Sequence, residues 1–188
     1  MNKIVCVGRN YVEHIKELNN EIPSEPVYFI KPMSCVKEEI NLVDYSPMHY
    51  EGEICFLIGK QLKVGFGFDF TLREIQNELK KKGLPWERAK AFKGAAVFSD
   101  FVEFNNIEDL GLEVYKNKKI VQKADVSLMI YKPEFLFKDI DKIFGLYEGD
   151  IVMTGTPKGV GVVKKGDEFE GRILEKGEVI VSKKWIVK

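Results

Sequence analysis

Short apolar runs, some alternating with polar residues and some continuous, recur along most of the chain and are bounded by glycine, proline or asparagine. β-Strands produce this pattern because successive side chains point to opposite faces of a sheet. A strand near residue 150 leads into a glycine-rich turn that ends at residue 161. The pattern predicts other strands at residues 3–7, 26–30, 39–45, 49–58, 64–71, 110–115 and 119–123, and in the tail after residue 162. The strands at 110–115 and 119–123 flank residues 116–118 and are predicted to form a hairpin.

Helical periodicity is confined to a few segments. The spacing predicts short helices at residues 11–18 (ended by Asn19 and Asn20), 71–82 and 86–92, and an amphipathic helix at 133–144. Thr71 and Glu74 have the spacing of a capping box at the start of the second helix. Because strands outnumber helices, we expect a mostly β (α+β) fold, a β-sandwich or roll, formed by one domain that spans residues 1–188.

The charged residues are balanced, with 29 basic and 29 acidic side chains, and form no long block of one sign. We therefore expect no nucleic-acid partner and no membrane partner, and we interpret the lysine run at residues 80–82 as a solvated face. No apolar run has the length of a membrane span, and the N-terminus does not resemble a signal peptide. The three cysteines, Cys6, Cys35 and Cys55, are widely spaced in apolar contexts, which favours reduced core thiols in a cytoplasmic protein.

Two acidic residues, Glu51 and Glu53, lie two positions apart in the predicted strand at residues 49–58 and so point to the same face. Two carboxylates about 4 Å apart in a shielded site repel by roughly 4 kcal/mol at an effective dielectric constant of about 20. A proton, a basic side chain or a cation must offset this repulsion. Asp69 could supply a third oxygen ligand from a neighbouring strand, and an all-carboxylate set suits Mg²⁺ or Mn²⁺. The alternative is a solvated edge strand that carries two acids.

Acid–base chemistry near neutral pH points to the two histidines of the chain, His14 and His49. His14 and Glu17 stand three residues apart in a predicted helix, a spacing that lets the carboxylate orient the imidazole as a general base. The alternative is a surface histidine–glutamate pair. The glycine-rich turn at residues 154–161 lacks the ending of a Walker phosphate loop, but its backbone N–H groups and two hydroxyls could hold a small carboxylate.

Seven short pieces of sequence follow one another in a fixed order. They are Gly8-Arg-Asn-Tyr11 with His14 and Glu17, Lys31-Pro32, Glu51-Gly-Glu53, Asp69-Phe-Thr-x-Arg73-x-x-Gln76, Lys81-Lys-Gly-Leu-Pro-Trp86, Lys90, and Thr154-Gly-Thr-Pro-Lys-Gly-Val-Gly161. Together they resemble the fumarylacetoacetate hydrolase family, in its branch of short acylpyruvases and oxaloacetate decarboxylase-like proteins. The resemblance covers nearly the whole chain, from about residue 3 to the 170s.

The resemblance implies a mixed β-sandwich roll of the C-terminal domain type of that family, a homodimer, and one Mg²⁺ or Mn²⁺ in each subunit. Its site residues are carried over position by position. They are Glu51, Glu53 and Asp69 for the metal, His14 and Glu17 for a water-activating dyad, Lys90 as the active-site lysine, and Arg73, Gln76 and Thr156 for the substrate.

The implied activity is magnesium-dependent hydrolysis of a carbon–carbon bond in acylpyruvate-type diketo acids, through a metal-stabilised enolate. A decarboxylase or isomerase of oxo-diacids, such as oxaloacetate or intermediates of aromatic degradation, is the alternative on the same site. The partner in either case is a small 2-oxo acid. A hypothesis of another class is a non-catalytic module that binds a metal and a carboxylate. His14, Glu17 and Lys90 weigh against it, since a binding module needs no base.

Overall fold

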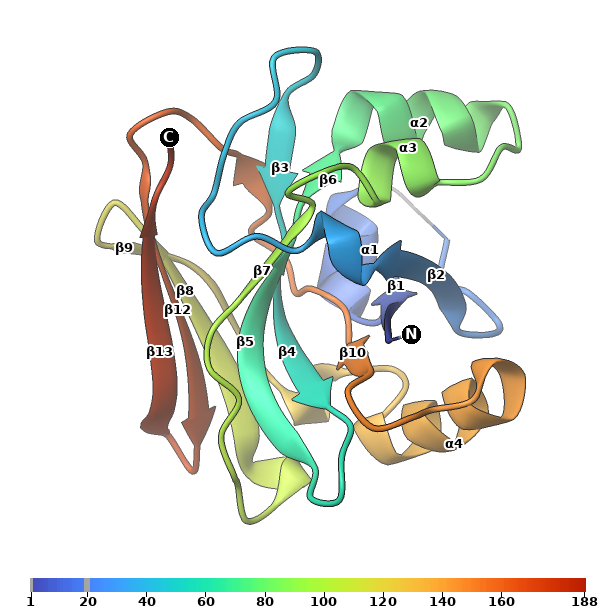
Figure 1. Ribbon diagram of the computed structural model, residues 1–188, viewed down its shortest axis with the longest axis vertical. Helices are drawn as coiled ribbons and strands as arrows, with labels where there is room; N and C mark the ends of the chain where they lie inside the picture. The colour runs from blue at the N-terminus through green and yellow to red at the C-terminus, as the bar shows by residue number, and fades with distance from the viewer. Residues whose placement is uncertain (1, 19–20) are drawn as a thin grey trace.

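The computed structural model describes residues 2–18 and 21–188, so the predicted end of the first helix at Asn19 and Asn20 lies outside the described residues. Within those ranges the strands form three sheets (Figure 1). The largest has six strands in the order β2-β1-β10-β4-β5-β7; β1 and β10 run parallel, and the other neighbours are antiparallel. Its members are β1 (Lys3–Gly8), β2 (Val27–Pro32), β4 (Gly52–Leu57), β5 (Lys63–Asp69), β7 (Ala96–Phe98) and β10 (Ile151–Met153).

A four-stranded antiparallel sheet, in the order β13-β12-β8-β9, packs against β4 and β5 of the first sheet (Figure 1). A small third sheet, in the order β11-β3-β6, lies at one end of the molecule. The predicted mostly β sandwich is therefore confirmed. The strands of these two sheets are β8 (Leu110–Lys116), β9 (Lys119–Asp125), β12 (Glu168–Glu175) and β13 (Glu178–Ile186), then β3 (Met48–Tyr50), β6 (Thr71–Leu72) and β11 (Gly161–Val162).

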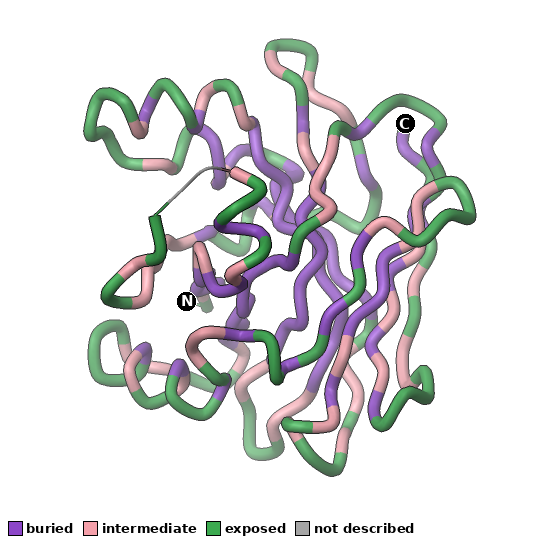
Figure 2. Tube along the Cα trace, turned by 180° about the vertical axis from the view of Figure 1, so that it is seen from behind, coloured by how far each residue is buried: buried purple, intermediate pink, exposed green. Residues whose placement is uncertain are grey.

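Aromatic side chains fill the space between the two large sheets. The ring centroid of Phe68 on β5 lies 5.3 Å from that of Phe169 on β12 and 5.6 Å from that of Trp185 on β13. Gly171 on β12 is required here, because a Cβ atom would collide with the ring of Phe66. Burial is concentrated in these central strands (Figure 2). The core thus anchors β4 and β5, which carry the acidic residues.

Short helices cover the rest of the large sheet. Side chains of α4, Leu136 and Ile140, pack on Val5 and Val152 and cover the outer face of β1 and β10. No helix of the described ranges is long and apolar enough to cross a membrane. The helices are α1 (Val12–Glu17), α2 (Arg73–Lys81), α3 (Glu87–Lys90) and α4 (Pro133–Phe144), with 3₁₀ turns at Met33–Cys35, Ile107–Asp109 and Val126–Leu128.

Most predicted elements are present, and three differ. Residues 39–45 form no strand; Ile40 is buried there, and its carbonyl oxygen accepts from the Lys188 N–H at 3.0 Å. The predicted capping box is also wrong, because Thr71 lies in β6 and its hydroxyl donates to the Asp69 carbonyl oxygen at 3.3 Å. The helix predicted at 86–92 is only one turn, Glu87–Lys90.

The predicted hairpin and the free thiols are confirmed. β8 and β9 are joined by Asn117 and Lys118, whose positive φ angles of 51° and 66° are those of a tight hairpin turn. Cys6, Cys35 and Cys55 are all free and buried.

Candidate active site

Three carboxylates, those of Glu51, Glu53 and Asp69, come together where β4 begins and β5 ends. Glu53 pairs with Gly67 in the ladder, and the Asp69 N–H donates to the Glu51 carbonyl oxygen at 2.8 Å. Carboxylate oxygens of all three residues lie within 4.8 Å of one another, and all three side chains are buried. The predicted acidic cluster is present, and the alternative of a solvated edge strand is wrong.

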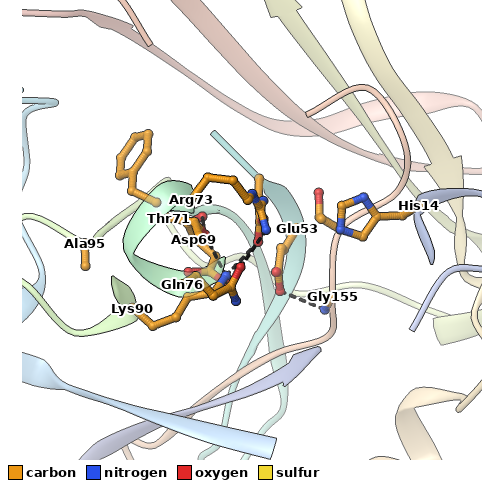
Figure 3. A network of polar contacts seen from close by, with 12 residues as sticks. His14, Glu53, Asp69, Thr71, Arg73, Gln76, Lys90, Ala95 and Gly155 are labelled. Carbon is orange, nitrogen blue, oxygen red and sulfur yellow. Dashed lines mark hydrogen bonds and ion pairs between the residues drawn. The ribbon is translucent and has the colours of Figure 1, made fainter. Parts of the chain in front are cut away.

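Basic side chains from the helices surround this cluster. Lys90 of α3 donates to Glu51 Oε2 at 2.8 Å and to Asp69 Oδ2 at 2.6 Å, and Arg73 of α2 pairs with Glu51 Oε1 (Figure 3). Burial would raise the pKa of Glu51, but the charges of Lys90 and Arg73 hold that pKa well below its usual range. Burial also opposes the charge on Lys90, yet Asp69 and Glu51 keep its pKa above the usual value. Glu51 and Lys90 are therefore both charged at neutral pH.

A second ammonium group, that of Lys31 on β2, contacts the other oxygen of Asp69. Its Nζ lies 2.9 Å from Asp69 Oδ1 and donates to the Ala95 carbonyl oxygen at 3.0 Å and to that of Lys90. Both Lys31 and Asp69 are fully buried. Asp69 is thus held between two ammonium groups.

Glu53 has a different environment. Its Oε2 accepts from the Gly155 N–H at 2.7 Å (Figure 3), and no basic side chain of the described ranges pairs with it. Burial and the neighbouring charge of Asp69 raise the pKa of Glu53 well above its usual range, against the effect of the Gly155 hydrogen bond. Gly155 has a φ of 99°, and a Cβ atom there would lie 2.9 Å from Cβ of Asn10. Only glycine lets the turn approach Glu53 in this way.

These donors fit a hard divalent cation. Three carboxylates in one buried cluster supply the oxygen ligands that Mg²⁺ and Mn²⁺ prefer. A cation would also relieve the repulsion that raises the pKa of Glu53, because a carboxylate binds a metal ion in its deprotonated form. The assignment of Glu51, Glu53 and Asp69 as the metal ligands therefore stands as a proposal that the geometry supports.

His14 and Glu17 form the predicted pair. Nδ1 of His14 lies 3.1 Å from Glu17 Oε2, and Glu17 Oε1 accepts from the Gly159 N–H at 3.0 Å. With Nδ1–H donated to the carboxylate, Nε2 keeps a free lone pair. Burial lowers the pKa of His14 although the charge of Glu51 and the Glu17 hydrogen bond oppose it, so the ring is neutral at neutral pH. The imidazole is buried and the Glu17 side chain is 32% exposed, so only the carboxylate half of the pair lies at the surface.

One cavity joins the predicted site residues. Arg73 Nη1 donates to Gln76 Oε1 at 2.7 Å on α2, and the Thr156 hydroxyl donates to the Gly52 carbonyl oxygen at 2.9 Å. Glu17 lies behind His14, and His49 is on β3 outside the lining. The predicted residues that line the cavity are His14, Glu51, Glu53, Asp69, Arg73, Gln76, Lys90 and Thr156.

Several residues of the site were missed by the sequence analysis. Gln122 of β9 is buried, accepts from the Gly52 N–H at 2.9 Å, and donates to Thr156 Oγ1 and to the Pro157 carbonyl oxygen, each at 2.8 Å. It ties the second sheet to the acidic strand and the glycine-rich turn. The sequence could have revealed Gln122, because it lies two positions before the buried Ala124 in the predicted hairpin. Side chains two positions apart on a strand point to the same face. Lys31 belonged to one of the sequence motifs but was assigned no role. Arg9 and Lys80 line the cavity and were not assigned to the site either.

Comparison with known proteins identifies the family. The sequence profile described as Fumarylacetoacetate (FAA) hydrolase C-terminal matches residues 3–183. The chain belongs to the fumarylacetoacetate hydrolase family. The resemblance seen in the sequence motifs is therefore confirmed, and with it the fold of that family's C-terminal domain.

Members of the fumarylacetoacetate hydrolase family resemble this chain over nearly its whole length. "Oxaloacetate tautomerase oaa1, mitochondrial" from Schizosaccharomyces pombe is 40% identical over 207 residues, which cover 96% of this chain and 93% of the relative. The crystal structure of a candidate fumarylacetoacetate isomerase/hydrolase from Oleispira antarctica has a TM-score of 0.96 and 37% identity, over 100% of this chain and 94% of that one.

A third member was solved with ligands. Fumarylpyruvate hydrolase from Pseudomonas aeruginosa, in complex with Mn²⁺ and pyruvate, has a TM-score of 0.87 and 26% identity, over 100% of this chain and 91% of that one. The relatives named by activity are enzymes, and this chain is an enzyme of the same family. The hypothesis of a non-catalytic module is set aside.

Proposed function

We propose that this enzyme interconverts the keto and enol forms of oxaloacetate, or of a closely related 2-oxo dicarboxylate, with a divalent cation held by Glu51, Glu53 and Asp69. One observation carries the proposal: a neutral imidazole, a buried ammonium group and three carboxylates converge in one cavity. The likeness to a tautomerase of oxaloacetate, over 96% of this chain, supports the same substrate class.

Tautomerisation needs a group that removes a proton from C3 of the keto form, and positive charge beside the oxygen at C2. His14 Nε2 is suited to accept the C3 proton, because burial keeps the ring neutral and Glu17 holds Nδ1. The C–H electron pair becomes the C2–C3 double bond, and a proton returned to the C2 oxygen completes the enol, so no co-reactant is consumed. When bound, the cation supplies Lewis-acid stabilisation of the oxo acid's negative charge.

Lys90 and the polar groups around it have complementary tasks. The ammonium group of Lys90 is fixed by two carboxylates and lends positive charge to the oxygen at C2. Arg73, Gln76 and Thr156 line the same cavity and hold the substrate in position. Arg73 and Gln76 are also bonded to each other, so that each fixes the other's orientation.

The test is an assay of enol-oxaloacetate in the ultraviolet, where the enol absorbs more strongly than the keto form. Purified enzyme is compared with added Mg²⁺, with added Mn²⁺ and after chelation, and released pyruvate is measured in parallel. We expect loss of the enol signal that is proportional to enzyme, dependent on the cation, and faster than pyruvate release. Enol decay at the uncatalysed rate with both cations would reject the proposal.

Hydrolysis of acylpyruvates, the activity first expected from the sequence, is the second candidate. It is favoured by the His14–Glu17 pair, which could equally take a proton from water, and by the likeness to a fumarylpyruvate hydrolase. Decarboxylation of oxaloacetate is a further possibility on this site, because it passes through the same enolate. Acetylpyruvate and fumarylpyruvate belong in the same assay.

Three expectations remain proposals: the identity of the cation, the oligomeric state and the cellular location. We propose that the cation is Mg²⁺ or Mn²⁺, as the three-carboxylate cluster suggests. We also propose that the enzyme is a homodimer, with one site in each subunit, and that it is cytoplasmic. Sedimentation equilibrium tests the dimer, and fractionation of the source cells tests the location.

A further inference from the structure

Two basic side chains of the cavity, those of Arg9 and Lys80, have no role in the chemistry above. Both line the same cavity as His14 and Glu53. Across residues 2–18 and 21–188, neither side chain forms a salt bridge or a hydrogen bond, whereas Arg73 and Lys90 are paired with carboxylates. The cavity therefore contains positive charge that the described part of the chain does not neutralise.

Arg9 has two unusual features. It directly follows β1 with a φ of 57°, in the left-handed region that residues other than glycine seldom adopt. Its Nε atom is buried, and no atom of residues 2–18 and 21–188 accepts a hydrogen bond from it. A buried donor without an acceptor destabilises the fold, and both features are found where a ligand completes a site.

Lys80 lies in the last turn of α2 and is half-buried. Its Nζ is 5.5 Å from the centre of the Trp86 ring, which also lines the cavity. Burial and the charges of Arg9 and Arg73 lower the pKa of Lys80 to about 8. Residues 81 and 82 are exposed, so the lysine run is only partly the solvated face expected from the sequence.

With a cation bound and Glu53 ionised, the three inner carboxylates balance the three inner basic groups without Arg9 and Lys80. A divalent cation would add two positive charges, and Arg9 and Lys80 add two more. A ligand with one carboxylate at the cation and a second carboxylate at Arg9 and Lys80 places negative charge at both positions, whereas a monoanion would be held at the cation and leave the outer charges unpaired. The balanced inner groups are the carboxylates of Glu51, Glu53 and Asp69 and the basic groups of Lys31, Arg73 and Lys90.

We propose that Arg9 and Lys80 form a subsite for the second carboxylate of a 2-oxo dicarboxylate. The inference rests on the proposed function and deepens it, because it selects diacids such as oxaloacetate over acylpyruvates that end in an alkyl group. The two residues come from separate segments, the end of β1 and the end of α2, and both line the same cavity. Trp86 and Phe29, whose ring centroids lie 5.9 Å apart, form an apolar wall of the same cavity.

The test measures binding without turnover. The probes are 3,3-difluorooxaloacetate, which has no proton at C3 and cannot enolise, and 3,3-difluoro-2-oxobutanoate, in which a methyl group replaces the distal carboxylate. Calorimetry with Mg²⁺-saturated protein gives both dissociation constants for wild type, Arg9→Gln, Lys80→Met and Lys80→Arg. Lys82→Met removes an exposed charge just beyond the same helix and is the matched control.

We expect wild type to prefer the diacid at least tenfold, and Arg9→Gln and Lys80→Met each to lose roughly ten- to one-hundred-fold in diacid affinity. Affinity for the monoacid should change less than twofold, and Lys80→Arg and Lys82→Met should keep the preference. An unchanged preference in Lys80→Met, or equal losses for both probes, would overturn the subsite. If Arg9→Gln does not fold, the half-exposed Lys80 decides the matter alone. A diacid preference in a protein that does not tautomerise oxaloacetate would leave the subsite standing and reject the proposed function.

Discussion

The ammonium nitrogen of Lys31 lies 2.9 Å from Oδ1 of Asp69, and both side chains are buried, at 0% and 1% exposure. The same nitrogen donates to the Ala95 carbonyl oxygen, between α3 and β7, so it ties the third carboxylate to the segment that carries Lys90. A buried charge is stable only when it is paired and hydrogen-bonded. Lys31 therefore pairs with Asp69 and fixes the orientation of its carboxylate before any cation binds.

Replacing Lys31 with Met leaves Asp69 with one ammonium partner, Lys90, and removes the hydrogen bonds from Lys31 to the carbonyl oxygens of Ala95 and Lys90. Breaking a buried pair from one side costs about 3–5 kcal/mol, so the free energy of unfolding of Lys31→Met should fall by that amount in urea. The double variant Lys31→Met with Asp69→Asn removes both charges and should recover part of the loss. A loss below about 1 kcal/mol in the single variant would show that the pair is solvated.

The second prediction concerns the cation. If Glu51, Glu53 and Asp69 share one ion, saturating Mg²⁺ or Mn²⁺ stabilises the folded state by about 2.7 kcal/mol at one hundred times the dissociation constant. The melting temperature should therefore rise with each cation and return to its starting value with EDTA. Glu53→Gln removes one ligand and should abolish the rise, whereas Glu74→Gln, an exposed change on α2, should keep it. The same rise in Glu53→Gln would place the ion elsewhere.

The third prediction separates the reactions at His14. Hydrolysis needs an activated water, whereas decarboxylation needs only positive charge beside the enolate. In His14→Ala, acylpyruvate cleavage should fall by roughly 10²–10⁴-fold, the usual contribution of a general base, and decarboxylation should fall much less. Tautomerisation should fall with hydrolysis, because it too moves a proton through the imidazole. Equal losses in all three reactions would make His14 a substrate-positioning residue.

The fourth prediction is a pH dependence at Lys80. Its pKa is lowered to about 8 by burial and by Arg9, Arg73 and Lys90, with Glu51 opposing, so free enzyme loses this charge as the pH rises through about 8. A bound carboxylate favours the charged form, and kcat/KM for the diacid should therefore fall above pH 8. Lys80→Arg stays charged and should show no such fall. A fall of the same size in both proteins would assign the titration to another group.

The pattern of apolar runs, alternating where one face of a strand is buried and continuous where both faces are, was sufficient to predict the strands of the two large sheets other than β7. It failed at residues 39–45, where Ile40 is buried beside the C-terminal residue. An apolar alternation indicates burial and does not indicate that a neighbouring strand exists. The capping-box prediction at Thr71 failed for a related reason. The spacing of a capping box is present in the sequence, but Thr71 lies in strand β6.

Part of the candidate site could also be predicted from the sequence, and part could not. Acidic residues two positions apart on a strand had to share a face, so Glu51 and Glu53 could be paired from the sequence alone. Asp69 was placed beside them because it lies in the next apolar run, and the ladder confirms that the two strands are neighbours. Lys31, Arg9 and Lys80 could not be found in this way, because their importance depends on burial and on unpaired charge. Both arise from contacts between segments far apart in the chain.

The most direct test of the proposed activity is exchange at C3 of oxaloacetate in D₂O, followed by proton NMR. Each enolisation that is reversed in D₂O replaces a C3 proton by deuterium, whether or not pyruvate is also released. We expect Mg²⁺-loaded wild type to exchange the C3 protons in proportion to enzyme concentration, and chelated wild type and Asp69→Asn to exchange them at the rate of the buffer alone. Exchange by loaded wild type at the buffer rate would contradict the account.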